Sequence, residues 1–286
     1  MSPPLLRLGL IITYRCNAEC RHCFFESGPS RDEVMSLDLG VKAIDEAIKL
    51  GAEWVSFTGG EPFLEPALLR RLIEYASGKG VKTEAVSNGY WGSSRETAEN
   101  VLQPLYDLGL DVLNLSVDDF HQEYVPMEYV RNAYGAALSL GLKTVIMNTT
   151  VKHSLITSAN IPELLQDDRI QVIGGPRIRD PNALLIETPI TPAGRGANIT
   201  EHDYTLISEV KCSEALRDIG VSPGGDVYPC CGPLAARKIL GNINDTSLQT
   251  ILEAAQRDPF ISSIRQGVYS TGVYTSKCHA CASLVE

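Results

Sequence analysis

Three cysteines with C-x3-C-x2-C spacing, Cys16, Cys20 and Cys23, stand close together near the start of the chain. Three thiolates within eight residues can bind one face of an iron–sulfur cube and leave its fourth iron without a protein ligand. A structural zinc site needs four closed ligands, and only His22 is near enough in the sequence to complete one. The spacing therefore favours a cluster with an open iron, and a zinc knuckle is the weaker alternative.

The sequence around these cysteines resembles that of radical S-adenosylmethionine (radical SAM) enzymes. The motif directly follows an apolar run, Leu8–Ile12, and Gly59-Gly60-Glu61-Pro62 comes later, as in that family. The resemblance implies that the three cysteines hold a [4Fe–4S] cluster whose open iron binds the amino and carboxylate groups of SAM. It also implies that one electron from the cluster cleaves SAM to methionine and a 5′-deoxyadenosyl radical. In relatives the residue before the last cysteine packs near the adenine, and His22 takes that position here.

Apolar runs recur along the first two thirds of the chain with helical segments between them, which predicts strand–helix units and a parallel sheet. The expected strands are Leu8–Ile12, Trp54–Phe57, Val81–Val86, Val112–Val117, Lys143–Met147 and Ile170–Ile173. Helices are expected after Ser36, from Pro66, over Ser94–Leu108 with a kink or split at Pro104, over Pro126–Leu140 and over Asn160–Leu165. Six such units match the partial (β/α)6 barrel of the radical SAM family, an α/β fold.

An open parallel barrel binds its ligands at the carboxyl ends of the strands, and polar residues follow three of the expected strands. The cofactor-binding residues that the resemblance implies are Gly59, Gly60, Glu61 and Pro62 for the amino group of SAM, Ser87 and Asn88 for its nucleoside or methionine part, and Ser116 and Asp118 for its carboxylate or ribose. Taken alone, a Gly-Gly or Asn-Gly pair indicates no more than a tight turn.

Other residues near the strand ends carry weaker signals. Asn148 and Thr149 follow the fifth strand and could face the cavity. Surface positions are expected for His121, His153 and His202. The segment Pro192–Gly196 resembles a Gly-Arg motif at the exit from the barrel of radical SAM enzymes.

Four cysteines after about Tyr204 form a second candidate metal site. Cys212 and Cys230 have C-x12-G-x4-C spacing around a turn, and Cys278 and Cys281 follow near the end. On spacing alone, a four-cysteine zinc ribbon is competitive. After a radical SAM core the pattern resembles SPASM or Twitch domains, which implies at least one auxiliary [4Fe–4S] cluster on these four residues.

The resemblance divides the chain into a radical SAM barrel at 1–200 and a SPASM/Twitch-like domain at 201–286, built from a hairpin and a helix at Thr246–Arg257. SPASM members usually continue with further cysteines where this sequence ends, five residues after Cys281. Whether a second auxiliary cluster exists is therefore left undecided. Cys231 adjoins Cys230 and is expected to be a bystander.

Composition limits the kinds of partner and the cellular compartment that fit this chain. The chain has 286 residues, 44% of them hydrophobic, and a net charge of −10, which argues against a nucleic-acid partner. No run approaches the roughly eighteen apolar residues of a membrane span, and no signal peptide is visible. The grouped cysteines fit a reducing cytoplasm, and the radical SAM resemblance implies an electron donor such as flavodoxin or ferredoxin.

The triplet Gly89-Tyr90-Trp91 resembles the motif of peptide cyclopropyl synthases, a SPASM-type subgroup that joins the γ-carbons of valine, or the equivalent carbons of isoleucine, in a precursor peptide. We therefore expect oxidative carbon–carbon bond formation on a ribosomally made peptide. The alternatives are epimerisation or a cross-link of a peptide, dehydrogenation of a small molecule, and a zinc-binding interaction module without enzyme activity.

Tyr90 is the catalytic residue that this resemblance implies. Relatives with full SPASM domains often carry an extra cysteine between the positions of Cys212 and Cys230, and this chain has none there. A phenol has a pKa of about 10, and a bound cation can deprotonate it. We therefore hypothesise that Tyr90 is a ligand of the auxiliary cluster.

Overall fold

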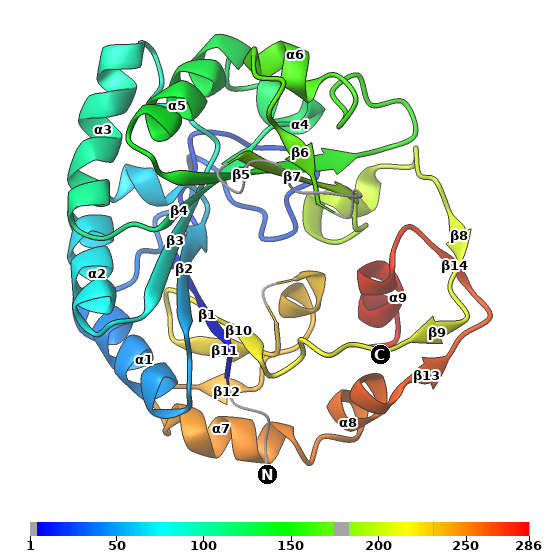
Figure 1. Ribbon diagram of the computed structural model, residues 1–286. Helices are drawn as coiled ribbons and strands as arrows, with labels where there is room; N and C mark the ends of the chain where they lie inside the picture. The colour runs from blue at the N-terminus through cyan, green and yellow to red at the C-terminus, as the bar shows by residue number, and fades with distance from the viewer. Residues whose placement is uncertain (1–4, 174–182, 231, 286) are drawn as a thin grey trace.

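A ten-stranded sheet forms the centre of the computed structural model, which describes residues 5–173, 183–230 and 232–285. The strand order is β12-β11-β10-β1-β2-β3-β4-β5-β7-β6. Neighbouring strands from β10 to β6 are parallel, whereas β11 and β12 are antiparallel to their neighbours. The sheet curves into an open barrel with helices on its outer side (Figure 1).

The barrel alternates strands and helices along the chain. Its strands are β1 (Arg7–Thr13), β2 (Trp54–Gly59), β3 (Lys82–Ser87), β4 (Val112–Ser116), β5 (Lys143–Thr150), β6 (Gln171–Val172) and β7 (Ala183–Pro189). Its helices are α1 (Leu37–Lys49), η1 (Pro62–Leu64), α2 (Pro66–Gly78), α3 (Arg95–Asp107), α4 (Asp119–Gln122), α5 (Met127–Ser139) and α6 (Ile161–Leu165).

The side chains of β1 show how the sequence separates core from cavity. Leu8, Leu10 and Ile12 are fully buried in the hydrophobic core that the strand shares with α1 and α2. Gly9 and Ile11 lie on the other face of the strand and line a cavity inside the barrel. Successive residues of a strand point to opposite faces, so an unbroken apolar run is what a strand buried on both faces requires.

The expected strands up to β5 are confirmed, and the sixth is confirmed only in part. Ile170–Ile173 gives only the two-residue edge strand β6, and β7 pairs with β5 along seven residues instead. β7 begins with apolar residues but ends in Glu187-Thr188-Pro189, so it lacks a strong strand pattern. The expected split at Pro104 is wrong, because α3 continues past it for three helical residues; a kink there stays a prediction.

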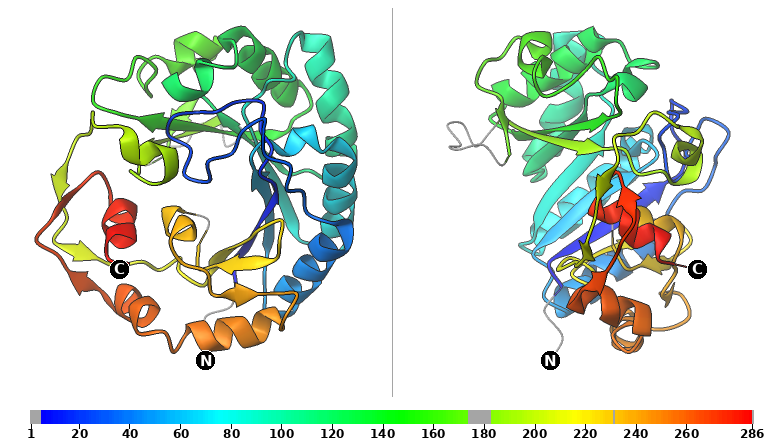
Figure 2. Two further views of the ribbon diagram at one scale, coloured as in Figure 1. Left: turned by 180° about the vertical axis from the view of Figure 1, so that it is seen from behind. Right: turned by 90° about the vertical axis from the view of Figure 1, so that its right-hand side faces the viewer.

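The C-terminal part extends the barrel sheet and then runs beside its open side. β10 (Asp218–Val221) pairs with β1, and β11 (Asp226–Tyr228) and β12 (Gly241–Asn242) follow it, which confirms the expected hairpin. The other elements are η2 (Gly194–Asn198), β8 (Thr205–Leu206), β9 (Glu209–Val210), η3 (Pro233–Ala236), α7 (Leu248–Ala255), α8 (Pro259–Gln266), β13 (Val268–Tyr269), β14 (Val273–Tyr274) and α9 (Lys277–Ser283). Figures 1 and 2 show that these segments complete a ring with the barrel, with α9 inside it.

The helix expected over Thr246–Arg257 is confirmed as α7. None of the helices in the described parts of the chain is long and apolar enough to cross a membrane.

Candidate functional site

The first cysteine motif forms a loop directly after β1. Cys16 and Cys20 are buried, Cys23 is half-buried, and none of the three is in a disulfide. The loop is held by backbone bonds of 3.1 Å from Cys16 N to the Gly28 carbonyl and from Cys23 N to the Cys20 carbonyl. Burial raises the pKa of the Cys16 thiol to about 12 and also raises that of Cys20. A bound cation would reverse this effect and deprotonate the thiols.

Arg195 fastens the cysteine loop to the end of the barrel. Its Nε donates to the Cys20 carbonyl at 3.1 Å, and its Nη2 donates to the Ser27 carbonyl at 2.7 Å. Its backbone N–H donates to the Cys23 carbonyl at 3.1 Å. The neighbouring Gly194 has φ +55°, and a Cβ there would lie 2.5 Å from a carbonyl oxygen of the loop. The Gly-Arg pair therefore docks onto the cysteine loop.

Gly59 and Gly60 allow the end of β2 to touch the chain just before the first cysteine. A Cβ at Gly59 would lie 2.2 Å from the Thr13 carbonyl oxygen, and one at Gly60 would lie 2.1 Å from that of Arg15. Both glycines also line the cavity. Glycine is required at these two positions mainly because the backbone after β2 touches the backbone before Cys16, and less because a ligand is expected to approach. Pro62 begins η1 and is buried.

Glu61, Ser87 and Asn88 are brought together as expected, from the ends of β2 and β3. Glu61 is only 1% exposed, and its carboxylate accepts hydrogen bonds from Ser87 Oγ at 3.0 Å, Asn88 N at 2.8 Å and Phe63 N at 3.1 Å. Burial raises the pKa of Glu61 to about 7. Asn88 Nδ2 donates to Asn17 Oδ1 at 2.9 Å, which joins this network to the cysteine loop. The carboxylate can accept one further bond, since two oxygens offer about four acceptor positions.

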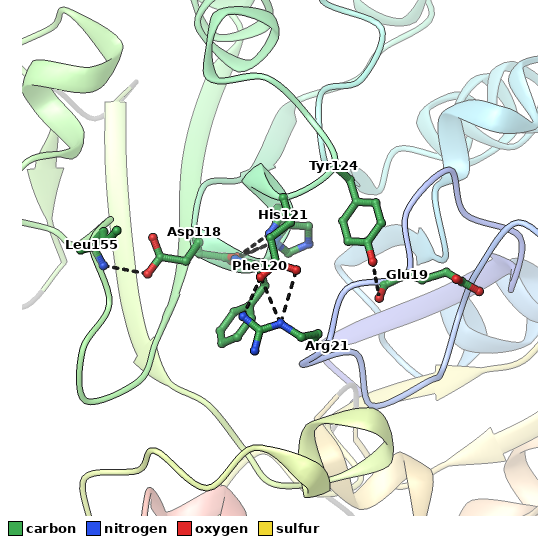
Figure 3. A network of polar contacts seen from close by, with 9 residues as sticks. Glu19, Arg21, Asp118, Phe120, His121, Tyr124 and Leu155 are labelled. Carbon is green, nitrogen blue, oxygen red and sulfur yellow. Dashed lines mark hydrogen bonds and ion pairs between the residues drawn. The ribbon is translucent and has the colours of Figure 1, made fainter.

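Buried Asp118 and half-buried His121 form a pair beside the cysteine loop (Figure 3). Asp118 caps α4 by accepting from Phe120 N and His121 N, and His121 Nδ1 lies 2.8 Å from Asp118 Oδ2. Burial acts against both charges, but their attraction holds the pKa of Asp118 below and that of His121 above its usual value. The surface position expected for His121 is wrong, because the cap folds its side chain back onto Asp118.

His22 contacts the same segment from the cysteine loop. Its ring stacks on Phe120 with 4.7 Å between the centroids, and it meets the ring of His121 edge to face with 4.8 Å between the centroids. Burial lowers the pKa of His22 to about 4, and its buried Nδ1 has no hydrogen-bond partner. Figure 3 also shows Tyr124 and Arg21: the Tyr124 hydroxyl donates to the loop at the Glu19 carbonyl, at 3.1 Å.

Many of these residues line one cavity of about 450 Å³. This volume is within the range of small-ligand sites. Its lining includes, from the expected sites, Cys16, Cys20, His22, Cys23, Gly59, Gly60, Glu61, Ser87, Asn88, Ser116 and Cys230. Pro62, Asp118 and Tyr90 are not in the lining. Sequence reasoning missed the polar residues of the lumen, Ser56, Glu84 and Asn114 among them, although alternation along β2, β3 and β4 is the signal that places them there.

The four C-terminal cysteines also gather at one place. Cys212 and Cys230 flank the β10–β11 hairpin, and Cys278 and Cys281 lie on α9. Burial and, to a smaller extent, the charges of the other three thiols raise the pKa of Cys230 to about 12. The pKa of Cys281 is likewise raised to about 12, by burial and then by the charges of Cys212 and Cys278. Thiols act on one another in this way only when they are close, so these four can serve one site.

Among the described residues, only His22, Asp118 and His121 form a group of three possible metal ligands with all ligand atoms within 4.8 Å of one another.

Tyr90 follows β3 and lies outside the cavity lining. Its hydroxyl donates to the Phe63 carbonyl at 3.2 Å, and its ring packs against the core. Burial raises the pKa of Tyr90 to about 12, and the largest charge effects on it come from Glu61, Arg15 and Cys16. The expected role of Tyr90 as a ligand therefore requires its side chain to leave Phe63, and it stays a prediction.

The positions expected for the residues after β5 and for the remaining histidines are partly confirmed. Thr149 lines the cavity, but Asn148 does not, because its Nδ2 donates to the Val117 and Ile156 carbonyls. His153 is exposed as expected. His202 is half-buried against the ring of Tyr204, so its expected solvated position is wrong. Cys231 lies outside the described residues.

Comparisons with known proteins agree with this geometry. A model of the radical SAM superfamily matches residues 10–148, and a model of the SPASM iron–sulfur cluster-binding domain matches residues 212–282. The chain therefore carries a radical SAM domain followed by a SPASM domain. The first domain implies a [4Fe–4S] cluster and SAM, and the second implies auxiliary iron–sulfur clusters. The buried thiols and the cavity beside Glu61 fit these groups.

The individual relatives are more distant. YydG of Bacillus subtilis, which has a provisional name as a peptide biosynthesis protein, is 25% identical over 77% of this chain and 67% of its own length. AlbA of the same organism, an antilisterial bacteriocin subtilosin biosynthesis protein, is 32% identical over 88% of this chain and 60% of its own. Streptococcus suis SuiB bound to precursor peptide SuiA has the same fold, with a TM-score of 0.60 and 17% identity over 91% of this chain and 66% of that one. The chain thus spans about two thirds of these relatives or less.

Proposed function

We propose that this protein removes a hydrogen atom from an unactivated side-chain carbon of a ribosomally made precursor peptide and closes a cyclopropane on valine or isoleucine. The observation that carries the proposal is that Cys230 and the first cysteine loop line one cavity. A side chain bound there would lie between the two cysteine sites. The names of YydG and AlbA and the peptide bound to SuiB support a peptide as substrate.

The chemistry needs both sites. When bound, the first cluster and SAM supply a primary alkyl radical, which can break a methyl C–H bond that acids and bases cannot. Ring closure removes one hydrogen as an atom and a second as a proton and an electron, so an electron acceptor is required. The C-terminal cysteines would hold that acceptor. An electron donor such as flavodoxin or ferredoxin would reduce the first site in a reducing cytoplasm.

The residues around the cavity have distinct tasks in this proposal. The remaining acceptor position of Glu61 would bind the ammonium of SAM, while Ser87 and Asn88 hold the carboxylate in place through bonds of 3.0 and 2.8 Å. His22 would contact the adenine, and Ser116, which lines the cavity, would contact the carboxylate or ribose. Asp118, which does not line the cavity, would act on these contacts by holding His121.

The choice of cyclopropane formation depends on Gly89-Tyr90-Trp91. Trp91 Nε1 donates to Ser87 Oγ at 2.9 Å, and the same hydroxyl donates to Glu61. The triplet is thus part of the network around the expected SAM ammonium, which supports a role in this chemistry. Tyr90 would become a ligand of the auxiliary cluster by giving up its bond to the Phe63 carbonyl.

Product mass tests the proposal. The reconstituted protein is incubated with SAM, a reductant and short peptides that contain valine and isoleucine, and the product is sequenced by mass spectrometry. Ring closure predicts the loss of two hydrogens within one valine or isoleucine. An unchanged mass with inverted stereochemistry, or two residues joined to each other, would replace cyclopropane formation by epimerisation or cross-linking. Deoxyadenosine formed only with a small molecule would overturn the peptide substrate.

A further inference from the structure

Three aromatic residues lie between the two cysteine sites, and the activity proposed above does not use them. Tyr14, Phe25 and Tyr228 each stand two residues away from a cysteine, in the order Cys16, Cys23 and Cys230. Tyr14 and Phe25 flank the first cysteine loop, and Tyr228 ends β11 of the C-terminal hairpin. Each ring is therefore linked by a short stretch of backbone to one expected cluster ligand.

The three side chains contact one another directly. The hydroxyls of Tyr14 and Tyr228 share a hydrogen bond of 3.1 Å, although the residues are 214 positions apart. The ring centroid of Phe25 lies 5.8 Å from that of Tyr14 and 6.3 Å from that of Tyr228, which are contact distances for aromatic rings. Tyr228 is only 7% exposed and packs with Ile11, so the contact is largely dry.

The two phenols are held by each other and by a neighbouring cation. Their hydrogen bond joins both hydroxyls, and Arg31 covers the ring of Tyr14 with its guanidinium 4.8 Å from the centroid. The result is a packed, hydrogen-bonded contact that connects the first cysteine loop to the C-terminal hairpin.

We propose that Tyr14, Phe25 and Tyr228 form an electron path between the auxiliary site and the SAM-cleaving site. The path carries one electron from the reduced auxiliary cluster, which is thereby oxidised, to the oxidised SAM-cleaving cluster, which is thereby reduced. No bond breaks, no proton moves, and the phenols stay neutral. The proposal rests on the proposed function in one respect: the electron taken from the peptide during ring closure would return to the first site, so that an external donor is needed only to begin turnover.

The path can be tested without a peptide, so its outcome does not depend on the substrate. A light pulse with a photoreductant supplies one electron per reconstituted chain, and freeze-quenched electron paramagnetic resonance spectra follow how the spin moves between the two clusters. Tyr14→Phe and Tyr228→Phe each remove the same hydrogen bond, one from either end. The test therefore needs only one of the two variants to fold and bind its full complement of iron. Phe25→Leu removes the ring contact. Tyr75→Phe, which removes a bond of 2.8 Å to Asp45 on the outer helices, is the matched control.

The wild type and Tyr75→Phe should show a fast phase of electron movement. The hydrogen-bond variants and Phe25→Leu should lose that phase yet reach the same final spin distribution, and their spin–spin coupling between clusters should be unchanged. A fast phase retained in all three variants would overturn the proposal. So would a lost phase accompanied by altered coupling, because the residues would then act by holding the hairpin in place.

Discussion

The carboxylate of Glu61 accepts a hydrogen bond of 3.0 Å from the hydroxyl of Ser87, although the two residues follow different strands of the barrel. The same hydroxyl accepts from Trp91 Nε1 at 2.9 Å. One network therefore joins the carboxylate expected to bind SAM to the triplet that suggests cyclopropane formation. Changes at any of these residues should act on the others, because a partly satisfied buried network is costly.

The stability of the cluster-free protein should depend on pH through Glu61. Its pKa is raised to about 7 by burial, so between pH 4.5 and 7 the folded protein keeps a proton that the unfolded chain releases. Glu61 should therefore lower the free energy of unfolding as the pH rises through this range, by about 3 kcal/mol. His22, whose pKa is lowered to about 4, acts in the opposite sense in both proteins, so urea unfolding of wild type and Glu61→Gln at several pH values measures the Glu61 contribution as the difference between the two profiles.

Glu253→Gln, on the exposed side of α7, is the control for this experiment and should follow the wild-type profile. The same pH profile in wild type and Glu61→Gln would mean that Glu61 is not a buried acid with a raised pKa.

Arg195→Ala should destabilise the cysteine loop itself, independently of catalysis. It removes two charged hydrogen bonds to loop carbonyls and should lower the free energy of unfolding by about 2 kcal/mol or more. The iron bound per chain and the deoxyadenosine formed under dithionite should both fall. Arg95→Ala removes an arginine that bonds Glu99 and Ser139 on the outer helices and should change neither. Full iron content in Arg195→Ala would refute the role of Arg195.

Short-range patterns were sufficient to predict the centre of this site. The spacing of Cys16, Cys20 and Cys23, and the place of Glu61 after an apolar run, each depend on residues close in the sequence. The bond from Arg195 to Cys20 joins residues 175 positions apart, and that from Tyr14 to Tyr228 joins residues 214 apart. No local pattern specifies such pairs, because they depend on how the C-terminal part packs against the barrel.

Tyr90→Phe separates packing from ligation. If the phenol only donates to the Phe63 carbonyl, the variant should lose about 1 kcal/mol of unfolding free energy and keep the wild-type cluster spectra. If Tyr90 is a ligand of the auxiliary cluster, as we propose, the variant should still cleave SAM but show altered auxiliary-cluster spectra and no modified peptide. Unchanged spectra with product at the wild-type rate would remove Tyr90 from the chemistry.

The acidic charge of the chain predicts that RNA is not the substrate. With a net charge of −10, transfer RNA should not bind at physiological salt. A filter-binding or anisotropy titration over a range of salt concentrations measures this. Tight binding that weakens steeply as salt rises would show a phosphate-binding surface and contradict the peptide proposal.

Cysteine replacement tests the central claim, that two separate cluster sites serve one cavity. One variant changes Cys16, Cys20 and Cys23 to alanine, and the other changes Cys212, Cys230, Cys278 and Cys281. The measurement is deoxyadenosine and modified peptide, formed under dithionite and compared with the iron bound per chain. We predict that the first variant forms neither product, and that the second forms deoxyadenosine but no modified peptide. Deoxyadenosine from the first variant, or modified peptide from the second, would contradict the account.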